Sequence, residues 1–183
     1  MPNLTFITGN LGKAKFFSEY FHVPVDHVAL DLQEIQSLDL KEVAEDKAWR
    51  AFAVVQKPVI VEDVSVVFES LTALPGPFIK WFLKTLGNDG LCKLVDSLES
   101  RNVHAEVIYA LCDGNEVQMF SGRIDGEIAS EPRGTNGFGW DPIFIPHGHE
   151  KTLGEMTEGE KSEISMRRIA LEKMSMYIGE KFS

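Results

Sequence analysis

The chain has 183 residues and a formal net charge of −10 at pH 7, with 44% hydrophobic and 25% charged residues. This composition is typical of a globular protein and excludes the disordered, collagen-like and coiled-coil classes. The acidic balance argues against duplex DNA or an anionic membrane surface as the main partner, because both bind basic surfaces. A small anion held in a local basic pocket remains compatible with it.

Neither the apolar runs nor the cysteines indicate export. No apolar run approaches the roughly 18 residues of a membrane span, and no basic stretch followed by an apolar one is found near Met1. Cys92 and Cys112 have a spacing that suits neither a metal knuckle nor a disulfide framework, so we expect buried thiols in a reducing compartment. We therefore expect a cytoplasmic protein, and the absence of repeats and linkers predicts a single domain over 1–183.

Strand and helix patterns alternate along the chain. Strands are expected at 4–8, 25–32, 59–61, 64–68, 103–111, 117–128 and 143–145. Helices are expected from the Gly9-Asn10 turn to 21, at 40–55, 75–84 and 90–98, and at 158–177. Asp113-Gly114 is a turn signal between two antiparallel strands. This mixed connectivity predicts an α/β fold with a central mixed β-sheet flanked by helices, and not a purely parallel sheet.

The loop Thr8-Gly9-Asn10-Leu11-Gly12-Lys13 follows the first predicted strand and opens a helix. Free backbone N–H groups and the helix dipole at such a position favour a phosphate, and Lys13 adds a positive charge. A P-loop is excluded, because Gly9 to Gly12 is too short and Ala14 stands where that motif has a magnesium-binding Ser or Thr. Taken alone, the loop indicates a phosphate site and a plain turn equally.

Carboxylates occur near the ends of predicted strands. Glu34 follows the second strand, and Glu62-Asp63 follow the apolar run 59–61. Mg²⁺ takes one or two carboxylates together with phosphate oxygens and water, so these positions suit a metal-bound polyphosphate. Position alone is weak support in a chain with 28 acidic residues, most of which are expected to be solvated surface groups. Asp63 is the stronger candidate of the adjacent pair, because it ends an apolar strand.

Two segments near the C-terminus are candidates for base and phosphate contacts. The run Gly137-Phe138-Gly139-Trp140-Asp141-Pro142 suits purine stacking, although a core-packing turn with Trp140 buried and Asp141 capping explains it as well. Lys161 and Ser165 are i and i+4, whereas Arg167 lies about 240° around a helix from Lys161. All three share a site only if a helix starts or breaks near Ser165; otherwise they form a solvated cationic face.

Taken together and in order, these motifs resemble the inosine triphosphate pyrophosphatase family over nearly the whole chain. The segments that carry the resemblance are Thr8-Gly9-Asn10-x-x-Lys13, Glu34, Val61-Glu62-Asp63, the run Leu74 to Leu83, Phe138-Gly139-Trp140-Asp141-Pro142 and Lys161-x-x-x-Ser165-x-Arg167. The resemblance implies an elongated two-lobed α/β fold, a nucleotide cleft between the lobes and a homodimer. It further implies hydrolysis of inosine, deoxyinosine and xanthosine triphosphates to the monophosphate and pyrophosphate, which removes them from the nucleotide pool.

The same resemblance assigns roles to residues. Glu34 and Asp63 would hold Mg²⁺, with Mn²⁺ as an alternative ion, and a water activated beside Asp63 would attack the α-phosphorus while Lys13 neutralises charge. The remaining residues implied to bind substrate are Thr8, Gly9, Asn10, Lys47, Lys80, Phe138, Gly139, Trp140, Asp141, Lys161, Ser165 and Arg167.

Two positions depart from the family pattern. Met166 stands where the family has His, and a thioether barely donates or accepts hydrogen bonds. Val64 stands where the family usually has Ser or Thr. These departures leave open two alternatives: a pyrophosphatase with altered or broadened base preference, and a nucleotide-binding protein with little turnover. Retention of Lys13 and Asp63 argues against the second.

Overall fold

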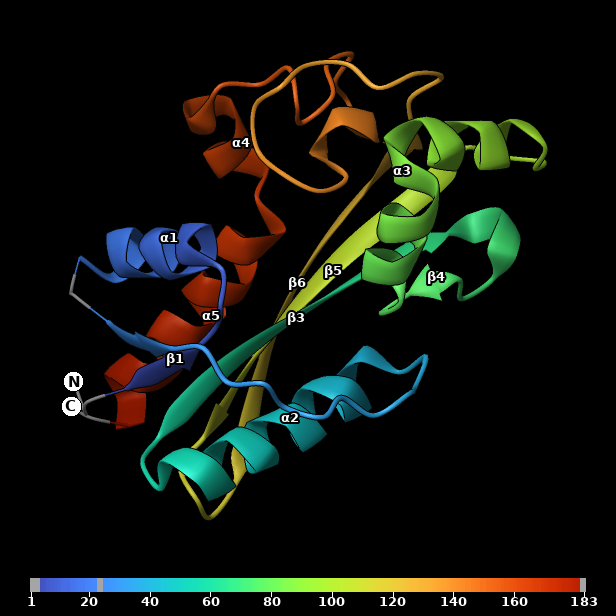
Figure 1. The fold of residues 1–183 in the computed structure, drawn as a ribbon. Helices are drawn as coiled ribbons and strands as arrows, with labels where there is room; N and C mark the ends of the chain where they lie inside the picture. Colours follow the sequence, from blue (N-terminus) through green and yellow to red (C-terminus); the bar gives the residue numbers. More distant parts are fainter. Residues whose placement is uncertain (1–3, 23–24, 182–183) are drawn as a thin grey trace. The chain divides into compact units, whose positions relative to one another are not determined.

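A computed structural model of the protein describes residues 4–22 and 25–181. Its elements in chain order (Figure 1) are β1 (Thr5–Ile7), α1 (Leu11–Phe21), β2 (Asp26–Val28), α2 (Leu40–Val55), β3 (Val59–Phe68), the 3-10 helix η1 (Glu69–Leu71), β4 (Pro75–Gly76), α3 (Ile79–Asp96), β5 (Asn102–Cys112), β6 (Val117–Ile128), the 3-10 helix η2 (Asp141–Ile143), β7 (Phe144–Pro146), α4 (Glu158–Ile164) and α5 (Met166–Lys181).

The chain forms two compact units. Unit 1 takes its described residues from 1–63, 107–121 and 169–183, and unit 2 is formed by 64–106 and 122–168. The strands β3, β5 and β6 each contribute residues to both units. The single domain, the elongated two-lobed shape and the nucleotide cleft stay predictions.

The strands of the described residues form one seven-stranded mixed sheet in the order β2-β1-β3-β5-β6-β7, with β4 paired to β3. The strand β1 is parallel to both neighbours, so that Thr5 pairs with Asp26 on one side and with Val59 on the other. The pairs β3–β4 and β6–β7 are antiparallel. The predicted α/β fold with a central mixed sheet is thereby confirmed.

In unit 1, helices cover both faces of the sheet because side chains alternate along β1. Ile7 faces a buried cluster that includes the alanines of α2, Ala44, Ala48 and Ala51. Small side chains at this spacing let the helix lie close to the strands. Phe6 points the other way and packs on Phe17 of α1, with ring centroids 5.1 Å apart. Figure 1 shows α1 and α2 on opposite sides of the strands.

In unit 2, the helix α3 packs against β4 and η2. Two helices were expected at 75–84 and 90–98, and α3 consists of two helical parts joined at a kink; its start is Ile79 and not residue 75, because Pro75–Gly76 pair as β4. Gly87 lies inside α3 with φ 65° and ψ 179°, a conformation essentially restricted to glycine. The predicted interruption is therefore present as a kink.

Two other predicted boundaries are wrong. The second strand was expected to run to residue 32, but β2 ends at Val28, and Leu30 and Leu32 beyond it pack against the core of unit 1 outside any strand. The runs 59–61 and 64–68 form one strand, β3, in which Glu62 and Asp63 lie mid-strand. Both carboxylates follow the segment of β3 that pairs with β1, which ends at Val61. Asp63 therefore lies just beyond this paired segment and does not end the strand.

Two expectations from composition can be compared with the structure. Cys92 and Cys112 are free and buried, as predicted. Among the described residues, none of the helices combines the length and the apolar character that crossing a membrane demands.

Candidate functional site

The turn between β1 and α1 is ordered by its own side chains. Asn10 is the N-cap of α1, where its Oδ1 accepts hydrogen bonds from the backbone N–H groups of Gly12 (2.9 Å) and Lys13 (3.3 Å). The hydroxyl of Thr8 accepts a hydrogen bond from the Asn10 N–H at 3.0 Å. The predicted strand, loop and helix are confirmed, and the helix start is capped by the chain itself, so its dipole is what favours an anion there.

Lys13 forms an ion pair with Glu62. Its Nζ lies 2.9 Å from Glu62 Oε1, and the Glu62 side chain is only 1% exposed while that of Lys13 is 22% exposed. A buried carboxylate is stable only with a partner, so this pair fixes where the Lys13 ammonium lies. The sequence favoured Asp63 over Glu62 because Asp63 was expected to end an apolar strand, and the spacing of 49 residues between Lys13 and Glu62 gives no signal of their pairing.

Lys47 of α2 bridges the two carboxylates that were predicted to hold a metal. Its Nζ lies 3.3 Å from Glu34 Oε1 and 3.1 Å from Asp63 Oδ2. Burial alone would lower the pKa of Lys47, but the charges of Asp63 and Glu34 outweigh it and the pKa is raised. Burial raises the pKa of Asp63, with the Lys47 charge opposing it. The structure thus brings Glu34, Asp63 and Lys47 together in unit 1.

The donor set suits only certain cations. Within 4–22 and 25–181, no group of three or more His, Cys, Asp or Glu side chains is placed to hold a metal ion. Glu34 and Asp63 supply two carboxylates, which is what Mg²⁺ uses when phosphate oxygens complete its shell. Asp63 Oδ2 is buried and, apart from its ion pair with Lys47, makes no well-aligned hydrogen bond. The residues therefore fit Mg²⁺ delivered with a polyphosphate, and not a cage made of protein ligands alone.

A second cluster lies in unit 2, around the loop 137–141. Asp141 Oδ2 accepts a hydrogen bond from the Phe138 N–H at 3.1 Å and lies 3.6 Å from Lys161 Nζ. Burial raises the pKa of Asp141, whereas the Phe138 N–H and the Lys161 charge oppose this shift. Gly137 has φ +88°, and a Cβ there would lie 1.9 Å from Asp141 Oδ2. Only glycine fits at this position.

The final helical segment is broken where a shared site requires it. The helix α4 ends at Ile164, Ser165 is extended with φ −69° and ψ 123°, and α5 begins at Met166. The single helix expected at 158–177 is therefore wrong. Because of the break, both Lys161 and Arg167 reach the loop 137–141: the Arg167 guanidinium lies 5.4 Å from the Phe138 ring centroid. Ser165 itself accepts a hydrogen bond from the Arg168 N–H at 3.4 Å.

Other predicted residues have different surroundings. Lys80 Nζ lies 5.7 Å from the ring centroid of its neighbour Trp81, and no contact with the loop 137–141 is seen among the described residues. Trp140 is half-buried and packs on Phe144 with ring centroids 5.2 Å apart. Its role is at least partly the core packing that was weighed against base stacking.

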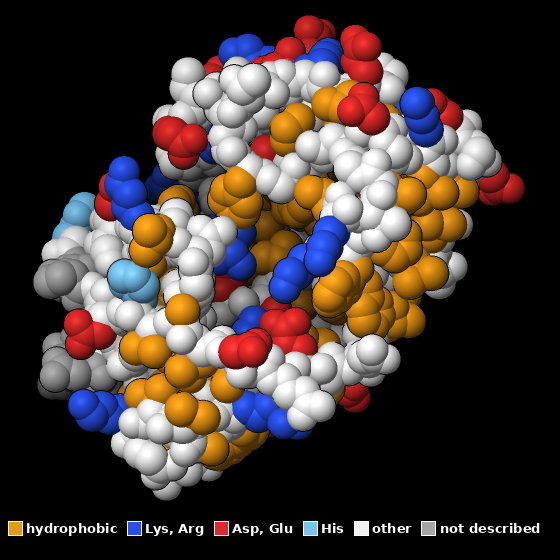
Figure 2. Space-filling view, viewed as in Figure 1, with side chains coloured by type: hydrophobic (Ala, Val, Ile, Leu, Met, Phe, Trp, Pro, Cys, Tyr) orange, Lys and Arg blue, Asp and Glu red, His pale blue; other side chains and the backbone are white. Residues whose placement is uncertain are grey.

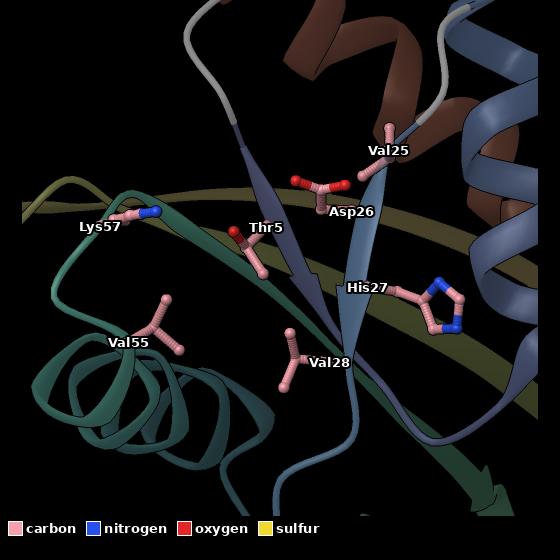
Figure 3. A pocket seen from close by; sticks show the side chains of 7 residues that line it. All are labelled: Thr5, Val25, Asp26, His27, Val28, Val55 and Lys57. Atoms are coloured by element: carbon pink, nitrogen blue, oxygen red, sulfur yellow. The ribbon is translucent and has the colours of Figure 1, made fainter.

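A pocket of about 520 Å³ opens elsewhere in unit 1 (Figure 3) and is lined by Thr5, Val25, Asp26, His27, Val28, Val55 and Lys57. It lies beside the amino ends of β1 and β3, whereas Asn10 and Glu62 follow the carboxyl ends of the paired segments. Ligands of open α/β sheets bind at the carboxyl ends of parallel strands. This pocket contains none of the predicted site residues and is not the candidate site.

Comparison with known proteins relates the two clusters to one family. Residues 4–177 match the model of the Ham1 family. The chain is 41% identical to inosine triphosphate pyrophosphatase 2 of Trypanosoma cruzi over 92% of this chain and 88% of that protein. It is 39% identical to a dITP/XTP pyrophosphatase of Thermococcus kodakarensis over 97% of both chains. A HAM1 protein structure from Coxiella burnetii has a TM-score of 0.87 at 25% identity, covering 98% of this chain and all of that one. The resemblance to inosine triphosphate pyrophosphatases is confirmed.

Proposed function

The chain belongs to the Ham1 family, and from this premise we propose that it hydrolyses inosine, deoxyinosine and xanthosine triphosphates to the nucleoside monophosphate and pyrophosphate. Relatives named for these activities are about 40% identical over nearly the full length. The observation that carries the proposal is the cluster in unit 1. It combines the capped start of α1, the Lys13 ammonium, and the group formed by Glu34, Lys47 and Asp63.

The cluster in unit 1 suits a triphosphate. The N–H groups of Gly12 and Lys13 are bonded to Asn10, so the positive end of the α1 dipole and the Lys13 ammonium would attract phosphate oxygens. Glu34 and Asp63 would hold Mg²⁺, which supplies charge neutralisation for the departing pyrophosphate when bound. Asp63 is buried beside Lys47, and we propose that a water activated next to its carboxylate attacks the α-phosphorus. Lys47 would hold Asp63 and Glu34 in place and balance their charge.

The cluster in unit 2 suits a purine with a 6-oxo group. Phe138 is 51% exposed, and its ring offers a stacking face. The Arg167 guanidinium beside it can donate hydrogen bonds but cannot accept them. The amino group of adenine would leave such donors unpaired, which penalises the wrong base. Phe138, Asp141, Lys161 and Arg167 therefore form the part of the chain that we propose contacts the base and its neighbouring groups.

A second candidate function is a pyrophosphatase with broadened base preference. Met166, the residue before Arg167, is buried and only 2% exposed. Its thioether offers no strong hydrogen bond to a base. If selectivity requires a hydrogen-bonding side chain at this position, turnover of the different purine triphosphates should become similar. A panel of nucleotides separates the two candidates.

The test is pyrophosphate release from inosine triphosphate, with adenosine and guanosine triphosphates as comparison substrates. The reaction is run with Mg²⁺, with Mn²⁺ and with chelator, for the parent protein, for Asp63→Asn and for the control Asp31→Asn, an exposed carboxylate in the same loop as Glu34. We expect metal-dependent, inosine-selective turnover that Asp63→Asn abolishes and Asp31→Asn leaves intact. Measurable nucleotide binding without turnover in the parent would refute the proposal and favour a binding protein.

The family resemblance implies a homodimer, the composition and cysteines predict a cytoplasmic location, and we propose both. The dimer is supported by exposed apolar side chains of unit 2, Leu74, Trp81 and Leu86, and Figure 2 shows hydrophobic side chains gathered over α3. Light scattering should give twice the chain mass, and Trp81→Arg should shift the protein towards monomer. A parent protein that stays monomeric at high micromolar concentration would exclude the dimer.

A further inference from the structure

The kink in α3 places one side chain against the loop 137–141. Gly87 interrupts the helix with φ 65° and ψ 179°, and a Cβ there would meet no atom within 4 Å. The glycine is therefore required by the backbone conformation and not by lack of space. Asn88 follows directly, and its Nδ2 donates a hydrogen bond to the carbonyl oxygen of Gly139 at 3.1 Å.

The orientation of the Asn88 amide is determined by its partner. A carbonyl oxygen only accepts hydrogen bonds, so the amide nitrogen of Asn88 must face Gly139. The other atom of the amide, Oδ1, is buried and has no hydrogen-bond partner among the described residues. An unpaired buried acceptor costs free energy. Among the described residues, the bond from Nδ2 to Gly139 is the only hydrogen bond of this amide that offsets the cost.

Few other contacts hold the tip of the loop. The Phe138 N–H is bound by Asp141 Oδ2, and the Phe138 carbonyl accepts a hydrogen bond from the Asp141 N–H at 3.2 Å. Both of these contacts lie within the loop itself. In the described part of the chain, Asn88 supplies the only hydrogen bond to the Gly139 carbonyl. Gly139 has φ +66°, and because it has no Cβ its backbone can adopt more conformations than that of other residues.

We propose that Asn88 is a positioning residue for the base: by holding the Gly139 carbonyl it fixes the backbone of Phe138, whose ring faces Arg167. This inference rests on the proposed function, because the loop contacts a base only if the chain binds nucleotides. Asn88 itself touches neither the base nor the phosphates. Its loss should weaken binding of the base-bearing substrate and leave the chemistry of the unit 1 residues unaltered.

The experiment compares Asn88→Ala and Asn88→Asp with the control Asp89→Asn, an exposed neighbour on the same helix. Turnover of inosine triphosphate by the parent is measured first, and this step tests the proposed function alone. KM and kcat are then determined for each variant. Inorganic triphosphate, which carries no base, is added as a competitive inhibitor. Hydrogen exchange of the backbone amides of 137–143 is followed in the free protein as a readout that does not depend on turnover.

We expect KM for inosine triphosphate to rise about fivefold in Asn88→Ala, the effect of one hydrogen bond, with kcat within about twofold of the parent. The rise should be larger in Asn88→Asp, because a carboxylate oxygen would face the Gly139 carbonyl without a donor. The inhibition constant of inorganic triphosphate should not change. The amides of 137–143 should exchange faster in both Asn88 variants than in Asp89→Asn.

Each contrary outcome is informative. If KM and hydrogen exchange of the Asn88 variants match those of Asp89→Asn, the positioning role is overturned. It is equally overturned if kcat falls while KM rises and the inhibition constant of inorganic triphosphate also rises. That pattern indicates a general loss of structure. If the parent does not hydrolyse inosine triphosphate, the proposed function fails, and the hydrogen-exchange comparison still decides whether Asn88 holds the loop.

Discussion

Replacing Lys13 with methionine should destabilise the protein chiefly through the carboxylate left behind. Lys13 Nζ and Glu62 Oε1 are 2.9 Å apart, and the Glu62 side chain is 1% exposed. At an effective dielectric constant of about 20, two unit charges at this distance interact by about 6 kcal/mol, part of which offsets the cost of removing both from water. Removing one partner of a buried pair typically costs about 3–5 kcal/mol. Because Lys13 is partly exposed, we expect about 3 kcal/mol.

The reverse change should cost less. Glu62→Gln leaves a lysine whose ammonium can reach water, so we expect a loss of about 1 kcal/mol. The double variant Lys13→Met/Glu62→Gln should recover about 2 kcal/mol relative to Lys13→Met, because no buried charge remains. Urea unfolding at pH 7 measures these differences, and the melting temperature of Lys13→Met should fall by about 6–12 °C. Equal costs for the two single changes, or a double variant no more stable than Lys13→Met, would refute the reasoning.

Three further predictions concern unit 2. Thr157→Ala removes the hydroxyl that caps α4 and should lower the free energy of unfolding by about 1 kcal/mol in urea titrations. Hydrogen bonds from Lys151 and from Thr157 lower the pKa of Glu160 to about 2. Its contribution to stability is therefore full above pH 4.5 and is lost as the pH falls towards 2, so melting curves of the parent and Glu160→Gln should converge on acidification. Gly137→Ala should raise KM for nucleotide more than Gly148→Ala, since both have positive φ but only Gly137 is crowded.

Local patterns predicted some elements well. The helix α2 runs from Leu40 to Val55 as expected, because its apolar stripe is regular and Asp39 caps its start. The strand β2 is shorter than its apolar pattern suggested, because Leu30 and Leu32 pack against the core from a segment that is not in the strand. The helix α3 begins later than expected, since pairing of Pro75–Gly76 with β3 takes precedence over the helix-start signal of proline.

The candidate site was predictable where its chemistry depends on nearby residues. The turn from strand to helix at Gly9-Asn10 was expected from nearby residues, and the loop from Gly137 to Asp141 is held by a local contact between Asp141 and the Phe138 N–H. The partners of these groups come from distant segments: Lys13 with Glu62, and Asn88 with Gly139, which are 51 positions apart. No residue spacing indicates such contacts, because they depend on which strands pair and on how α3 bends.

The break at Ser165 changes the meaning of the departure at Met166. In a continuous helix, Arg167 would lie on a different face from Lys161, and the two side chains could not reach the same loop. In the structure the extended backbone of Ser165 redirects the chain, and Arg167 lies over the Phe138 ring with methionine at 166. Met166 is buried and contributes apolar area to the core. Methionine at this position therefore removes one hydrogen-bonding group from the neighbourhood of the base, but it leaves in place the guanidinium that we propose distinguishes a 6-oxo purine from adenine.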